Sequence, residues 1–125
     1  MGRREEGQAM VELAITLSLL LVILLGVMEF ARLGHAYLVV THAAREGARV
    51  AALGYGDEIV EKRVLDSSST LDGTKLEVAV APETRIRGEG VMVQVSYPVD
   101  IIAPLIQQIL PSPVIVRGKT TMRVE

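Results

Sequence analysis

The sequence predicts an α+β protein in which a long N-terminal membrane-spanning helix continues into a small head, with a short helix and an antiparallel sheet of about three strands. An uncharged, apolar run from Leu13 to Met28 predicts the span, and helical spacing of apolar and small residues continues to Leu53. Alternation with a period of two begins near Lys75 and predicts the strands. No proline precedes Pro82, so nothing breaks a helix in the first half.

The apolar run is long enough to cross a membrane when its flanks are included. At about 1.5 Å per residue it covers roughly 24 Å of a ~30 Å hydrocarbon core, and the neighbouring residues supply the rest. We therefore predict a transmembrane helix over residues 8–30. A buried core helix is the first alternative, but too little chain follows to surround it. A removable secretory signal is the second, but its apolar region is shorter and does not continue as helix.

The helical spacing in residues 31–53 predicts an extramembrane continuation of the same helix. The whole helix would run from about Gln8 to Leu53 over roughly 69 Å. Small side chains form two rows along this part, and such rows let strands approach a helix closely. Gly54 predicts the end of the helix, because glycine readily adopts the left-handed conformation found there. The residues expected to pack against the head are Ala43, Ala44, Gly47, Ala48, Ala51 and Ala52.

Residues 54–125 are expected to form the small α+β head. A short amphipathic helix is expected over residues 57–69, with Asp57 as its N-cap. Strands are expected over residues 75–83, 90–99 and 114–125, and the glycines beside Arg87 predict a hairpin turn. The stretch "DIIAPLIQQILP", which begins at Asp100, is predicted to be either a short helix or a packed loop.

Composition excludes several functions. The 125 residues include no cysteine, which rules out a disulfide framework, a thiol nucleophile and a cysteine metal site. The net charge is −2 and aromatic residues are scarce, so we expect no nucleic-acid partner. His35 and His42 have no evident third ligand, and no catalytic set or phosphate-binding motif occurs. We therefore expect no metal, no cofactor and no enzymatic activity.

Glu12 is the fifth residue after Gly7 and stands directly before the apolar run, where a charge costs roughly 3 kcal/mol if it is buried in lipid. The charged stretch Arg3–Glu6, the glycine and this glutamate resemble the class III signal of type IV pilin-like proteins, in which a membrane peptidase cuts after the glycine. Cleavage would leave an α-ammonium on Gln8, which the positive end of a helix disfavours. A carboxylate one turn along can neutralise it, in the same chain or in a neighbour. The alternative is that Glu12 is simply a residue at the level of the lipid headgroups, near a helix start where a carboxylate is favoured anyway.

The match extends beyond this motif. The segments "GQAMVELA" from Gly7, "GVMEFARL" from Gly26 and "AAREGAR" from Ala43 resemble the TadE-like family of the tight-adherence (Flp) pilus systems, and the resemblance covers residues 7–53. Family members commonly carry a proline at the position of Ser18, which would kink the span. Ser18 can only bond back to the carbonyl of Ala14, a gentler perturbation.

The resemblance implies a pseudopilin whose leader, residues 1–7, is removed by prepilin peptidase between Gly7 and Gln8, and which uses Glu12 for assembly. It implies a single-pass protein of the inner (cytoplasmic) membrane, with its N-terminus in the cytoplasm and its head outside, or in an extracellular filament after assembly. The implied partners are the membrane, the peptidase, other pilin-like subunits in a homo- or hetero-oligomer, and the assembly platform. A major subunit, a minor or priming subunit and an assembly factor all fit.

Charged residues of the helix are candidates for pairs between subunits. Glu29 and Arg32 either pair at the membrane edge or mark the interface as snorkelling side chains. Arg45, Glu46 and Arg49 form either a solvated face or contacts to adjacent subunits. The competing function is a membrane-anchored extracytoplasmic domain that binds a ligand or acts as an adhesin.

Overall fold

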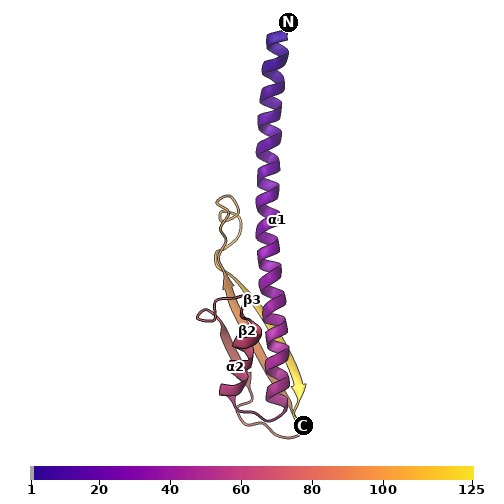
Figure 1. Ribbon diagram of the computed structural model, residues 1–125, viewed down its shortest axis with the longest axis vertical. Helices are drawn as coiled ribbons and strands as arrows, with labels where there is room; N and C mark the ends of the chain where they lie inside the picture. Colours follow the sequence, from indigo (N-terminus) through magenta and orange to yellow (C-terminus); the bar gives the residue numbers. More distant parts are fainter. Residues whose placement is uncertain (1) are drawn as a thin grey trace.

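The computed structural model describes residues 2–125 and confirms the predicted α+β class (Figure 1). Met1, the first residue of the predicted leader, lies outside the described residues. A long helix is followed by a short helix and a three-stranded antiparallel sheet with strand order β1-β2-β3. The elements are α1 (Gly2–Ala52), α2 (Asp57–Ser67), β1 (Glu77–Ala81), β2 (Gly90–Val99) and β3 (Val114–Arg123).

Helix α1 is a continuous rod of 51 residues, about 76 Å long, and only its C-terminal half packs against the head (Figure 1). It begins at Gly2 rather than at the predicted Gln8, because the arginines and glutamates before Gly7 are good helix formers. It ends as predicted, with Gly54 in the left-handed region at φ +88°. The side chains of Gly2 to Leu24 are exposed, which excludes a buried core helix.

The sheet presents one apolar face to the helices. Val91, Val93 and Val95 of β2 point to this face and have no exposed surface. The register aligns Val93 with Val80 of β1 and with Thr120 of β3, so the inward positions of the three strands lie side by side. The bounds of β2 match the prediction, whereas β1 and β3 are shorter than predicted.

The two helices cover this face of the sheet as a single layer, and the core lies between the layers. Val60 and Val64 of α2 are fully buried in it. Gly47 lies where α1 meets α2, and a β-carbon there would come within 2.7 Å of Val64 Cγ2. All six predicted packing residues are buried: Ala43, Ala44, Gly47, Ala48, Ala51 and Ala52.

The structure corrects one local prediction for the head and decides between two alternatives for another segment. Gly56 rather than Asp57 is the N-cap of α2, and no side chain caps the helix. Asp57 is instead the first helical residue, and its carboxylate forms an ion pair with Arg85, which explains why it does not turn back to the helix. The stretch after Asp100, for which the sequence left a short helix and a packed loop open, is a loop of successive turns, and it extends beyond the sheet alongside α1 (Figure 1).

Candidate functional site

The predicted processing motif lies on the exposed N-terminal half of α1. A β-carbon on Gly7 would have no other atom within 4 Å, so this face of the helix is open. Gln8 and Glu12 lie one turn apart, on the same side as Gly7, Val11 and Ile15. Among the ion pairs of residues 2–125, none involves the Glu12 carboxylate. This carboxylate is therefore free to meet a group from outside its own chain or a newly made N-terminus.

Ser18 behaves as the sequence predicts. Its hydroxyl donates a hydrogen bond of 2.7 Å to the carbonyl of Ala14, and Thr16 donates one of 2.8 Å to the carbonyl of Glu12. Both hydroxyl groups are thus satisfied within the helix, which matters in a segment where lipid offers no partner. The helix passes Ser18 without interruption, so the kink that a proline would produce is absent from this span.

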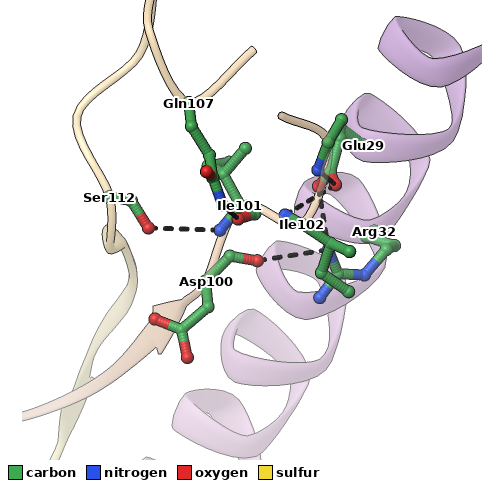
Figure 2. Close-up of polar contacts among 8 residues, drawn as sticks. Glu29, Arg32, Asp100, Ile101, Ile102, Gln107 and Ser112 are labelled. Carbon is green, nitrogen blue, oxygen red and sulfur yellow. Dashed lines mark hydrogen bonds and ion pairs between the residues drawn. The ribbon is translucent and has the colours of Figure 1, made fainter. Parts of the chain in front are cut away.

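A second polar cluster lies where α1 meets the loop after Asp100 (Figure 2). The Glu29 side chain is only 2% exposed. Its Oε1 accepts hydrogen bonds from the backbone N–H groups of Ile102, at 2.8 Å, and Ala103, at 2.9 Å. Its Oε2 accepts a hydrogen bond of 2.8 Å from Arg32 Nη1, which forms an ion pair with it. Every oxygen of this carboxylate is therefore occupied within the chain.

Arg32 completes the attachment by donating from the same nitrogen to the carbonyl of Asp100, at 3.1 Å. The loop is also bonded within itself, since Gln107 Nε2 donates to the carbonyl of Ile101, at 2.6 Å, and the Ile101 N–H donates to Ser112 Oγ, at 3.3 Å (Figure 2). Glu29 and Arg32 thus fasten one end of a turn-rich loop to the helix. We call these two residues and their contacts to Asp100, Ile102 and Ala103 the Glu29 clamp.

Pairing of Glu29 with Arg32 was one of two alternatives that the sequence left open, and the structure shows this pair within the chain. The loop as their common partner was not predicted. The contact joins residues more than seventy positions apart, which no local periodicity reveals. A usable signal was the spacing of Gly26, Glu29 and Arg32, which puts a small residue and two charges on one helix face. Pairing of Glu29 or Arg32 with another subunit stays a prediction.

Replacing Glu29 with alanine should release the loop from α1. The N–H groups of Ile102 and Ala103 lose their acceptor, so hydrogen exchange of residues 100–106 should become faster in the detergent-solubilised chain. Glu29→Gln should have a smaller effect, because the amide keeps an oxygen for the loop but presents a donor to Arg32. The matched control is Glu58→Ala on the surface of α2, which should leave the loop unchanged. Unchanged exchange in Glu29→Ala would show that the clamp does not hold the loop.

The three charged residues farther along α1 lie on the outer side of the helix. Arg45 and Arg49 are exposed, and Glu46 pairs with Arg63 of α2, with Nη2 to Oε2 at 2.9 Å. The hydrogen bond from Arg63 lowers the pKa of Glu46 below its ordinary value and outweighs the opposing effect of partial burial. Arg45 and Arg49 remain the candidates for charged contacts with adjacent subunits.

An exposed apolar half of α1 joined to a small two-layer head is the architecture of a protein with a membrane anchor and a small extramembrane domain. Within residues 2–125, α1 is the one helix long and apolar enough to cross a membrane, which is consistent with single-pass anchoring. Residues 7–49 match the family model described as TadE-like protein, so the resemblance to this family is confirmed over the segment that contains Gly7, Glu12 and the clamp residues of α1. The match indicates a protein associated with the Tad pilus. No curated protein and no solved structure matches the chain.

Proposed function

We propose that this protein is a pilin-like structural subunit, a pseudopilin, of a Tad pilus or a related secretion apparatus, and not an enzyme. In this proposal prepilin peptidase removes residues 1–7, and the new amino group of Gln8 pairs with Glu12 of the same or a neighbouring chain. The N-terminus faces the cytoplasm and the head lies on the other side of the inner membrane. Other pilin-like subunits and the inner-membrane assembly platform are the proposed partners.

The observation that carries this proposal is the exposed Glu12 carboxylate, which stands five residues after Gly7 in the matched segment and has no ion-pair partner among the described residues. A carboxylate at the edge of a lipid-facing helix is energetically costly, and ionisable residues in such segments usually serve a function. The small-residue face of α1 is buried against the head of the same chain, so the exposed N-terminal half is the apolar part of the helix left for packing between subunits.

Processing tests the proposal directly. When the full chain is co-expressed in membranes with a prepilin peptidase, intact mass spectrometry should show loss of residues 1–7 and a new N-terminus at Gln8. Gly7→Val should block this loss. Gly2→Val is the matched control and should still be processed, since both glycines lie in open positions of the same helix. An uncleaved chain that stays monomeric in detergent would support the anchored ligand-binding or adhesin domain instead.

A further inference from the structure

The loop between β2 and β3 is unusually apolar for an exposed segment. Residues 101–113, which we call the apolar loop, contain no charged side chain. Four of its large apolar residues are nevertheless exposed: Ile102 at 60%, Leu105 at 49%, Ile109 at 80% and Leu110 at 40%. Apolar residues gathered in this way on a small head mark an interaction surface.

The apolar loop lies beside the lipid-facing part of α1. The Glu29 clamp fixes its first residues to the helix, and Ile106 Cδ1 would lie 3.8 Å from a β-carbon on Gly26. Gly26 belongs to the uncharged run from Leu13 to Met28, so the loop reaches the level of the predicted span. Figure 1 shows the loop extending past the strands toward the N-terminal half of α1.

The length of the span indicates where along α1 the membrane boundary lies. From Gln8 to Leu25, α1 covers about 27 Å, close to the ~30 Å thickness of the hydrocarbon core. The predicted span of residues 8–30 continues only about one turn beyond Gly26, where Ile106 packs, so its outer end lies roughly 6 Å farther along the helix. The exposed side chains of the apolar loop then stand at the boundary between acyl chains and headgroups.

The backbone of the apolar loop is suited to this position, because many of its polar groups are satisfied within the chain. The N–H groups of Ile106 and Gln107 bond to the carbonyl of Ala103, and those of Ile109 and Leu110 bond to the carbonyl of Ile106. Three prolines of the loop have no N–H to satisfy: Pro104, Pro111 and Pro113. Non-helical backbone near lipid requires such internal pairing.

We propose that the apolar loop inserts into the interfacial layer of the leaflet on the head side of the membrane, beside α1. The proposal rests on α1 crossing the membrane, which is part of the proposed function. Insertion gives the head a second point of attachment to lipid, which restricts the tilt of the head relative to the membrane surface. Because the loop carries no charge, zwitterionic lipid suffices for insertion. The Glu29 clamp sets how far the loop reaches along the helix.

Depth-dependent fluorescence quenching tests the insertion. The chain has no tryptophan, so a single introduced tryptophan reports one site. Ile109→Trp probes the tip of the loop, Leu20→Trp the span, and Tyr55→Trp the far end of the head. Each full-length variant is reconstituted as one copy per nanodisc of phosphatidylcholine with brominated acyl chains. We expect blue-shifted, strongly quenched emission for Ile109→Trp, approaching that of Leu20→Trp, and unquenched emission for Tyr55→Trp.

The controls separate the outcomes. An unquenched Ile109→Trp beside a quenched Leu20→Trp would overturn loop insertion while leaving the anchor intact. If Leu20→Trp is also unquenched, single-pass anchoring itself fails. Shielding of Ile109→Trp from aqueous acrylamide only in discs that hold two or more copies would assign the loop to contacts with a second chain and reject the lipid. Leu105→Trp repeats the measurement at a second exposed position, in case one substitution perturbs the loop.

Discussion

Replacing Glu12 with alanine is expected to abolish assembly of the chain into filaments while leaving cleavage after Gly7 intact. The substitution removes a carboxylate that lies one turn from Gln8 on an exposed face of α1 and takes part in no ion pair of the described chain. Helix α1 itself should persist, because alanine is the strongest helix former.

Assembly should fail in Glu12→Ala because processing creates a positive charge that then has no partner. Cleavage places an α-ammonium at a helix end that already carries partial positive charge, inside or beside lipid. Without Glu12 no other carboxylate lies within a turn of Gln8 in the mature chain, so neither the chain nor an identical neighbour can neutralise it there. Filament yield after shearing and intact mass of the membrane fraction measure assembly and cleavage separately.

Glu58→Ala is the matched control, because it removes one exposed carboxylate from α2 and should leave both readouts normal. Glu12→Asp serves as the conservative variant and should restore part of the filament yield, since it keeps the charge on a shorter side chain. Normal piliation in Glu12→Ala would refute the assembly role of this residue.

The second large effect is expected from Gly118→Ala in the middle of β3. A β-carbon there would lie 2.6 Å from the carbonyl oxygen of Val40 and 2.7 Å from the backbone nitrogen of Thr41. These are backbone atoms of α1, so no rotamer change relieves the clash and the strand must move away from the helix. Overpacking of this kind costs about 2–3 kcal/mol. For a head of this size the cost lowers Tm by roughly 10–20 °C.

Gly34→Ala is the control for this substitution. Gly34 is also a glycine of the described chain, but it lies within α1 and a β-carbon there would have no other atom within 4 Å. Alanine should therefore preserve stability or raise it by up to about 1 kcal/mol. Thermal unfolding of the full chain in detergent, followed by circular dichroism, compares the two variants. Equal Tm values for Gly118→Ala and the unmodified chain would contradict the close packing of β3 on α1.

Much of the fold was predictable because it follows from local patterns. The alternation of valines gives the bounds of β2, and Gly54 ends α1 by a conformation that glycine adopts readily. The small residues between Ala43 and Ala52 predict a helix face that strands can approach. Gly118 went unnoticed at the sequence level, although a glycine inside a strand is itself a signal of close backbone approach.

The parts that were missed depend on contacts between distant segments. Asp is a residue type typical of N-caps, so Asp57 was predicted to cap α2. Its carboxylate instead pairs with Arg85, which lies 28 positions away in the sequence. From the sequence, Arg32 was the only partner expected for Glu29 within the chain. In the structure two backbone N–H groups of the loop after β2 also donate to the Glu29 carboxylate. For the same loop the sequence left a short helix and a packed loop open, because its apolar residues have neither a clear helical nor a clear strand period.

The decisive measurement for a role as a processed pilus subunit is the N-terminus of this chain inside assembled filaments. Filaments sheared from cells that make the pilus are purified and analysed by mass spectrometry for peptides of this protein. We expect the chain to be present and its N-terminal peptide to begin at Gln8. Purified filaments that lack the chain, while an uncleaved form beginning at Met1 remains in the membrane, would contradict a role as a processed, assembled subunit.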